Sequence, residues 1–275
     1  MSEIAVITGT THGIGRVTSR ELARAGKTVV MLCRAVPAAQ AVRAEILTQL
    51  PQARIHIVHC DLASLASVRE CAASVRRDHA PIGLLINNAG MVSLRHRMSV
   101  DGFELTFATN HLGPFLLTAL LSDCLASDAR IVNVASRIHF QGRLEPERIT
   151  NPHARYDSRA AYAQSKLANV LHTFALARRL SGSGICVNCL HPGVVATNLL
   201  PRWLRLLKPL MSHVLDVERG ARTGLYLALD PAPAAVSGRY FDEHQNPQSA
   251  APLANDPQLQ ESLWRMSARW TAVAA

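Results

Sequence analysis

Short apolar runs alternate with segments of helical periodicity along most of the chain. The apolar runs predict strands at residues 4–8, 28–33, 54–59, 82–87, 130–135 and 184–190. The segments between them predict helices from the end of the glycine loop to residue 25 and over 38–50, 64–78, 102–126 and 159–180. Continuous rather than alternating apolar strands indicate a sheet covered on both faces. We therefore expect one α/β domain over residues 1–275, a doubly wound parallel sheet of about seven strands with helices on both faces.

A glycine-rich turn lies between the first predicted strand and the first predicted helix. Gly9, Gly13 and Gly15 have the spacing G-x-x-x-G-x-G. Gly9 permits a tight turn, Gly13 lets the backbone approach a pyrophosphate, and Gly15 lets the helix pack on the strand. Phosphate groups bind at such helix N-termini. The turn predicts a Rossmann-type dinucleotide site, with a cofactor-binding half over about residues 1–135.

The end of the second strand indicates which dinucleotide binds. NAD sites usually place a carboxylate there to hold the ribose hydroxyls, but the strand ends Leu32-Cys33-Arg34. The Arg34 guanidinium suits a 2′-phosphate, and an acid there would repel it. We therefore expect NADP(H) rather than NAD(H), with His12 as a second phosphate contact; the alternative is a surface arginine at the start of a loop.

Two polar segments follow the third and fourth strands. The carboxylate of Asp61 either binds the adenine amino group or caps the helix that begins near Ser64. Asn87-Asn88-Ala89-Gly90 ends the fourth strand at the carboxyl edge of the sheet, where ligands bind in open α/β folds. Asn and Gly are also common in ordinary turns, so this segment alone decides little.

Tyr162 and Lys166 lie four residues apart in the predicted helix 159–180. Such a pair shares one helix face. An ammonium beside a phenol lowers the phenol pKa, which makes Tyr162 a candidate general acid or base. Taken alone, the pair also fits a helix with one buried tyrosine and one solvated lysine.

Composition and charge exclude several classes of protein. The net charge is +9, but the basic residues are dispersed and no basic cluster is interleaved with aromatics, so we expect no nucleic-acid partner. No apolar run of about 18 residues predicts a membrane span, and the N-terminus has no signal-peptide pattern. We therefore expect a cytoplasmic protein. Cys186 and Cys189 would face opposite sides of a strand, so we expect buried thiols and no metal site.

Six motifs together resemble the short-chain dehydrogenase/reductase family over nearly the whole chain. They are TGTTHGIG (8–15), NNAG (87–90), Asn110 in NHLG, Ser136 in IVNVAS, YAQSK (162–166) and HPGVVAT (191–197). The Cys-Arg after the second strand, NHLGPFLLT, SKLAN and the ending SGRYF…LW are most similar to the retinol-dehydrogenase-like branch. Members of that branch often carry an N-terminal membrane anchor, which we do not expect in this protein.

The resemblance implies a role for each matching residue. Tyr162 would be the general acid or base, and Lys166 would hold the nicotinamide ribose and lower the Tyr162 pKa. Ser136 would bind the substrate oxygen, and Asn110 would anchor a water in a proton relay. The implied cofactor-binding set is Gly9, Thr11, His12, Gly13, Ile14, Gly15, Arg34, Asp61, Leu62, Asn87, Ala89, Gly90, Tyr162, Lys166, Pro192, Gly193, Val194 and Thr197.

Two segments are expected to shape the substrate pocket, and the first of them is longer than in the wider family. Ser136 and Tyr162 are 26 residues apart, and the inserted residues 137–161 are expected to form one wall of the substrate site. His139, in this insertion, and His111 are not expected to be catalytic. Residues 198–215, rich in Leu with one Trp and one Met, are expected to form a lid over a lipophilic substrate. The alternatives are a helix over the sheet edge or a segment that rests on a membrane surface.

We therefore expect an NADP(H)-dependent oxidoreductase that interconverts a lipophilic alcohol and its ketone or aldehyde, with reduction as the working direction. The alternative is a non-catalytic NADP(H)-binding sensor or scaffold. The resemblance also implies a homodimer or homotetramer, formed through the helices that carry Asn110 and Tyr162.

Overall fold

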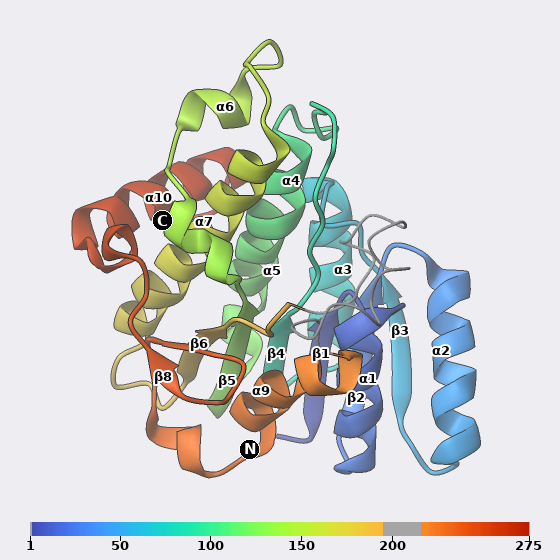
Figure 1. Ribbon diagram of the computed structural model, residues 1–275. Helices are drawn as coiled ribbons and strands as arrows, with labels where there is room; N and C mark the ends of the chain where they lie inside the picture. The colour runs from blue at the N-terminus through green and yellow to red at the C-terminus, as the bar shows by residue number, and fades with distance from the viewer. Residues whose placement is uncertain (1, 195–215, 275) are drawn as a thin grey trace.

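In the computed structural model, the described residues 2–194 and 216–274 contain one sheet of eight strands in the order β3-β2-β1-β4-β5-β6-β7-β8 (Figure 1). The strands are β1 Ile4–Thr8, β2 Thr28–Cys33, β3 Ile55–His59, β4 Ile82–Asn87, β5 Leu125–Val134, β6 Cys186–Leu190, β7 Arg239–Phe241 and β8 Pro247–Gln248. All neighbours pair in parallel except β7 and β8. The predicted doubly wound parallel sheet is confirmed, and the two-residue β8 accounts for the strand beyond the expected seven.

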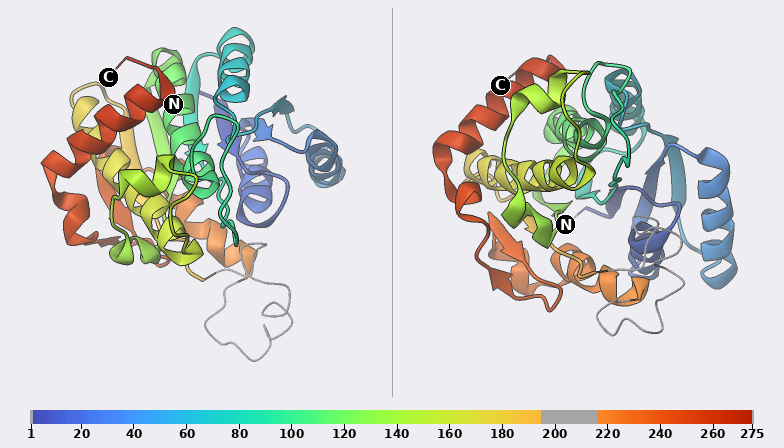
Figure 2. Two further views of the ribbon diagram at one scale, coloured as in Figure 1. Left: turned by 90° about the horizontal axis from the view of Figure 1, so that it is seen from above. Right: turned by 45° about the horizontal axis from the view of Figure 1, so that its top comes forward.

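Helices cover both faces of the sheet (Figure 2). The α-helices of the described residues are α1 Gly13–Arg24, α2 Val36–Gln49, α3 Leu65–Asp78, α4 Leu105–Phe107, α5 Gly113–Leu121, α6 Pro146–Thr150, α7 Ser158–Arg179, α9 Val217–Leu229 and α10 Pro257–Thr271. Most predicted boundaries agree with these to within two residues. None of these helices is long and apolar enough to cross a membrane.

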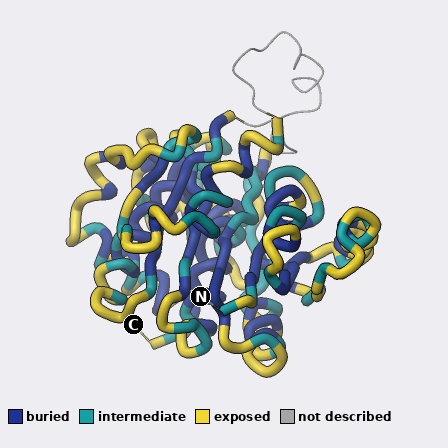
Figure 3. The backbone as a smooth tube through the Cα atoms, turned by 90° about the horizontal axis from the view of Figure 1, so that it is seen from below, coloured by how far each residue is buried: buried dark blue, intermediate teal, exposed yellow. Residues whose placement is uncertain are grey.

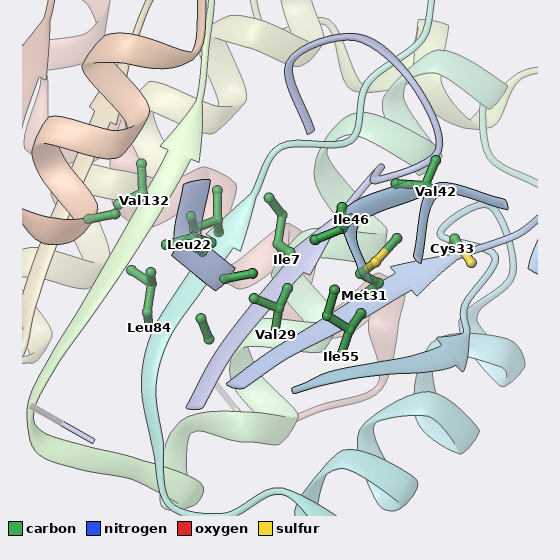
Figure 4. Packing of buried hydrophobic residues seen from close by; sticks show 14 of the residues in the cluster. Ile7, Leu22, Val29, Met31, Cys33, Val42, Ile46, Ile55, Leu84 and Val132 are labelled. Atoms are coloured by element: carbon green, nitrogen blue, oxygen red, sulfur yellow. The ribbon is translucent and has the colours of Figure 1, made fainter. Parts of the chain in front are cut away.

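Alternate residues of each central strand enter two different cores. Ile7, Val29 and Met31 pack under α1, α2 and α9 (Figure 4), whereas Val6 and Val30 pack under α3, α5 and α7. Buried residues accordingly concentrate along the strands, and exposed residues on the outer helices (Figure 3). The continuous apolar pattern of the strands follows from this burial on both sides.

The helix expected over 102–126 is interrupted and shorter. It begins after Glu104, whose carboxylate caps α4 by accepting from the backbone of Thr106 and Phe107, at 2.8 and 2.7 Å. Between α4 and α5 lies a π-helical turn, Ala108–Leu112. Pro114 has no N–H to give to the carbonyl of Asn110, which favours this wider turn. Strand β5 then begins at Leu125 rather than at Arg130, because it continues its pairing with β4 as far as Ile82.

Helix α10 lies across α7 and also contacts α5 (Figure 1). Trp264 of α10 packs against Phe115 and His172, with ring centroids 5.2 and 5.6 Å apart. The Arg179 guanidinium lies 4.0 Å from the Trp264 ring and also pairs with Glu261. The helices expected to form a subunit interface are thus covered by the C-terminal helix of the same chain.

Candidate active site

The glycine turn joins β1 to the N-terminus of α1 in the way its spacing predicts. Gly9 and Gly13 have φ angles of +72° and +58°, which residues with a side chain rarely adopt. A methyl group on Gly15 would stand 2.1 Å from the carbonyl oxygen of Gly9, so only glycine fits there. Helix α1 begins at Gly13, and this arrangement directs backbone N–H groups toward a phosphate.

Asn88 holds this turn against β4, a role that the sequence did not reveal. Its side-chain amide donates to the carbonyl oxygens of Thr8 and Gly9, at 2.9 and 3.2 Å. The Thr8 hydroxyl in turn accepts from the backbone of Asn88 and Ala89, both at 3.0 Å. The second asparagine of NNAG could have indicated this role, because its side-chain amide can donate to several carbonyl oxygens at the end of a neighbouring strand.

Arg34 directly follows β2 and is exposed at the carboxyl edge of the sheet. Within the described residues, no hydrogen bond or ion pair holds its guanidinium. His12 is also exposed, and its Nδ1 lies 3.0 Å from the Thr11 hydroxyl. Both side chains are therefore open to a ligand near the glycine turn.

The residues after β3 resolve one of the open alternatives. Ser64, not Asp61, caps α3, because the Ser64 hydroxyl accepts from the backbone of Ser67 at 3.3 Å. Asp61 accepts instead from the Ala63 backbone at 3.0 Å. Capping by Asp61 is therefore wrong, and contact with adenine stays a prediction. Leu62 is buried in the core under α3.

The side chain of Asn87 points into the protein. Its amide donates to Asn133 of β5 at 2.8 Å and to Thr118 of α5 at 3.1 Å. Asn133 donates onward to Thr173 of α7 at 2.9 Å. Asn87 thus braces the sheet against two helices, and a contact of its side chain with the cofactor stays a prediction.

Ser136 and Tyr162 come together although 26 residues separate them along the chain. Ser136 lies just beyond β5, and its hydroxyl is close enough to the Tyr162 side chain, in the first half of α7, to influence the phenol. Asp157 fixes the start of α7 by accepting from the backbone of Arg159 and Ala160, at 2.8 and 3.1 Å. The inserted residues before this cap form a 3₁₀ turn, Arg137–Gln141, and the short helix α6.

Lys166 lies one turn further along α7. Its Nζ is 5.7 Å from the centroid of the Tyr162 ring and donates to the carbonyl oxygen of Val134 at 2.8 Å. The side chain is buried. A methyl group on Gly90 would stand 3.3 Å from Nζ and 3.6 Å from Oδ1 of Asn110. The absence of a side chain on the glycine of NNAG therefore leaves room beside the lysine ammonium.

The electrostatics of the pair differ from the sequence-based expectation. Burial raises the pKa of Tyr162 to about 12, and the nearby Ser136 hydroxyl opposes that rise. Burial also lowers the pKa of Lys166 to about 8. The expected lowering of the Tyr162 pKa is thus wrong for this form of the protein, because burial of the phenol dominates. The phenol stays protonated at neutral pH, as a proton donor must.

Asn110 occupies the π-helical turn between α4 and α5. Its Oδ1 accepts from the backbone of Met91 at 2.8 Å, and its Nδ2 donates to the Met91 carbonyl at 2.9 Å and to the Ser165 hydroxyl at 3.0 Å. These contacts tie the segment after β4 to α7. The side chain is fully buried beside Gly90 and Lys166.

The segment after β6 reaches the same edge of the sheet. The backbone of His191 donates to Phe241 at 2.9 Å, Gly193 has a φ angle of +81°, and Val194 is exposed. Pro192 lies between them, half-buried. Thr197 and the lid expected over 198–215 lie outside the described residues.

Two surface hollows flank the insertion rather than the Ser136–Tyr162 pair. Their volumes are about 470 and 290 Å³, and they share Arg148, Arg155, Tyr156 and Asp157 in their linings. Neither is lined by Ser136, Tyr162 or Lys166. Among the described residues, no group of three or more His, Cys, Asp or Glu side chains is placed to hold a metal ion.

Comparisons with known proteins agree with this geometry. Residues 3–205 match the family model described as short chain dehydrogenase. Human retinol dehydrogenase 13 is 38% identical to the chain, over 98% of this chain and 85% of its own length. A crystal structure of an uncharacterized protein from Mycobacterium paratuberculosis matches with a TM-score of 0.81 and 32% identity, over 98% of this chain and 93% of that one.

A second solved structure carries a nucleotide. The blue fluorescent protein from a metagenomic library, in complex with NADPH, matches with a TM-score of 0.70 and 25% identity, over 87% of this chain and 95% of that one. The similarity in sequence and the similarity in fold both extend over most of the chain. The chain therefore belongs to the short-chain dehydrogenase family of oxidoreductases, in the branch that resembles the retinol dehydrogenases.

Proposed function

We propose that the protein is an NADP(H)-dependent oxidoreductase that interconverts a lipophilic alcohol and its aldehyde or ketone, working mainly as a reductase. The observation that carries this proposal is the meeting of Ser136, Tyr162 and Lys166 at one edge of the sheet, with the Lys166 Nζ 5.7 Å from the centroid of the Tyr162 ring. Retinol dehydrogenase 13 is by its name an alcohol oxidoreductase, which supports the same class of reaction.

In carbonyl reduction, Tyr162 gives its phenolic proton to the substrate oxygen. The Ser136 hydroxyl stabilises the negative charge that develops on that oxygen, and this contact accelerates the reaction in so far as it strengthens in the transition state. The raised pKa of Tyr162 supports a donor role, since the proton is present throughout the physiological pH range.

Lys166 and Asn110 serve the proton path and the cofactor. The Lys166 ammonium is assigned to the nicotinamide ribose, and Asn110 to the water that relays a proton between Lys166 and solvent. Both side chains border the space left by Gly90, which supports these assignments.

The cofactor-binding residues fit a dinucleotide, and NADP(H) better than NAD(H). When bound, the cofactor supplies the hydride. A glycine turn that no larger residue could adopt lies at the N-terminus of α1, where a pyrophosphate is expected. Arg34 occupies the place of the ribose-binding acid, and its exposed guanidinium suits a 2′-phosphate.

Two exposed apolar side chains support a lipophilic substrate. Phe140 lies in the turn that follows Ser136, and Val194 follows β6, the strand next to β5. Each exposes 52% of its surface. Together with the apolar composition of residues 198–215, they favour a substrate with little polar surface.

Location and assembly also belong to the proposal. We assign the protein to the cytoplasm. Because α10 covers α5 and α7, we propose that a homodimer or homotetramer forms through another face.

The test is NADPH oxidation across a panel of lipophilic aldehydes and ketones, with NADH and the variant Tyr162→Phe in parallel. We expect turnover with NADPH, slower turnover with NADH, and a loss of roughly 100- to 10,000-fold in Tyr162→Phe, the range typical of a general acid. The variant should still bind NADPH, with a loss of affinity far smaller than the loss of turnover, because it lacks only one hydroxyl of the cofactor-binding set.

Two outcomes would contradict the proposal. Turnover that survives in Tyr162→Phe would show that another group donates the proton. NADPH binding with no turnover on any substrate of the panel would favour the sensor or scaffold function.

A further inference from the structure

We propose that His139 is a positioning residue that fixes Ser136 for the reaction, with its imidazole holding the Ser136 turn to the C-terminal part of the chain. This inference rests on the proposed function, in which Ser136 binds the substrate oxygen. His139 does not reach the substrate in this proposal and acts only through Ser136.

Both nitrogens of the fully buried His139 imidazole have partners on the backbone. Nδ1 lies 2.7 Å from the carbonyl oxygen of Ser136, and Nε2 lies 3.1 Å from the backbone nitrogen of Ala251. The ring is also held between Phe140 and Tyr240, with centroids 4.3 and 4.8 Å away. This packing leaves the imidazole one orientation.

The partners determine where the imidazole proton lies. A backbone N–H can only donate, so Nε2 must accept from Ala251. A carbonyl oxygen can only accept, so Nδ1 must carry the proton that it donates to Ser136. Burial lowers the pKa of His139, which keeps the ring in this neutral form. Protonation would place an N–H against the N–H of Ala251 and break the contact.

The bond to Ser136 orients the serine hydroxyl through the turn that follows it. The Ser136 carbonyl accepts from the His139 ring and also from the His139 backbone, at 3.0 Å, so one residue fixes that peptide group twice. The same turn places the Ile138 N–H 3.4 Å from the Ser136 hydroxyl oxygen. Accepting this bond occupies a lone pair of the oxygen and not its proton, so the Ser136 hydroxyl can still donate to the substrate oxygen.

The contact with Ala251 anchors this turn far away in the sequence. Ala251 belongs to a buried cluster that includes Ala250, Ala254 and Leu263 of α10. The C-terminal region thus supports the active-site serine through His139.

Three variants separate the two bonds of His139. In His139→Asn the side-chain amide lies where Nδ1 was and can still donate to the Ser136 carbonyl. In His139→Gln the amide lies where Nε2 was, so its oxygen can accept from the Ala251 backbone but the side chain cannot reach Ser136. His139→Phe keeps a ring of similar size and loses both bonds. All three are compared with the wild type for kcat, KM for NADPH and for the aldehyde, and thermal midpoint.

We expect kcat to fall by roughly 10- to 100-fold in His139→Phe and His139→Gln, the scale of a small displacement in an active site, with KM for NADPH unchanged. His139→Asn should recover kcat to within about 3-fold of the wild type. Equal kcat values in the Asn and Gln variants would overturn the proposal. The proposal would also fail if the loss of kcat across the three variants correlated with the fall in thermal midpoint and not with the loss of the bond to Ser136.

Amide hydrogen exchange gives a second readout that needs no turnover. The Ile138 amide should exchange faster in His139→Phe and His139→Gln but not in His139→Asn, and the Ala251 amide faster in His139→Phe and His139→Asn but not in His139→Gln. If the wild type lacks turnover, the proposed function fails while this exchange pattern still decides the role of His139. Ile138 protection that is the same in all four proteins would refute that role.

Discussion

Lys166 lies 5.7 Å from the ring of Tyr162 but donates its hydrogen bond to the carbonyl oxygen of Val134, on the last residue of β5. The ammonium is thereby anchored to the sheet, next to the strand end that presents Ser136. Burial lowers the pKa of Lys166 to about 8 and raises the pKa of Tyr162 to about 12. The lysine therefore loses its proton first as the pH rises.

The pH dependence of the reaction should report this order. We expect kcat/KM for carbonyl reduction to decline above about pH 8, as Lys166 loses the charge that holds the ribose, while Tyr162 is still protonated. The measurement is a pH–rate profile from pH 6 to 10 at low substrate. In Lys166→Arg the charge persists, so a slower enzyme without this decline is expected. A wild-type profile that is flat to pH 10, or the same decline in Lys166→Arg, would disprove the assignment.

Cofactor choice should depend on Arg34. Reversing its charge in Arg34→Glu should lower kcat/KM for NADPH by roughly 10- to 100-fold, the scale of one charge-assisted hydrogen bond. The kcat/KM for NADH should stay the same or rise, because NAD(H) has no 2′-phosphate and a carboxylate at this position can hold its ribose hydroxyls. The matched control is Arg222→Glu, an equal charge change at an exposed residue of α9. Equal losses with both cofactors, or in both variants, would argue against a 2′-phosphate contact.

Much of the fold and part of the site were predictable because they depend on local chemistry. The apolar strands, the glycine turn and the Tyr162–Lys166 spacing each follow from neighbouring residues. The role of His139 was missed because its partners are the Ser136 carbonyl and the Ala251 backbone, and Ala251 lies 112 residues away.

Tertiary contacts explain the other differences between expectation and structure. The Asn87 side chain points inward because its amide donates to Asn133 and Thr118, which come close to it only in the folded protein. The Tyr162 pKa depends on how completely the pocket is buried, which the spacing of two residues on a helix does not determine.

The glycine turn should be intolerant of the smallest substitution. Gly15→Ala places a methyl group 2.1 Å from the Gly9 carbonyl and 2.5 Å from the Asn88 amide nitrogen, both held in place by hydrogen bonds. We expect a loss of about 1–3 kcal/mol in the free energy of unfolding by urea, together with weaker NADPH binding. In Gly224→Ala, inside α9, Leu190 at 3.7 Å is the one described residue that the methyl group would contact. That control should gain about 0.5–1 kcal/mol, and a Gly15→Ala protein of unchanged stability would contradict the packing.

Stability should fall in acid because two buried histidines must stay neutral. Burial lowers the pKa of His111 to about 3 and of His172 to about 4. Both pKa values are near 6.5 in the unfolded chain, so below pH 6.5 the unfolded state binds more protons than the folded state. Each histidine should then cost about 1.4 kcal/mol of unfolding free energy per pH unit, down to its folded pKa.

The variant His172→Phe isolates one of these contributions. Neither ring nitrogen of His172 has a partner among the described residues, and the ring packs on Trp264, so an apolar ring should cost little at pH 7.5. We measure the free energy of unfolding by urea between pH 7.5 and 5. Below pH 6.5 this free energy should fall less steeply in His172→Phe than in the wild type, by about 1.4 kcal/mol per pH unit. His153→Gln, which removes an exposed histidine, should keep the wild-type slope. Equal slopes in all three proteins would mean that His172 is protonated in the folded state, which its packing under α10 opposes.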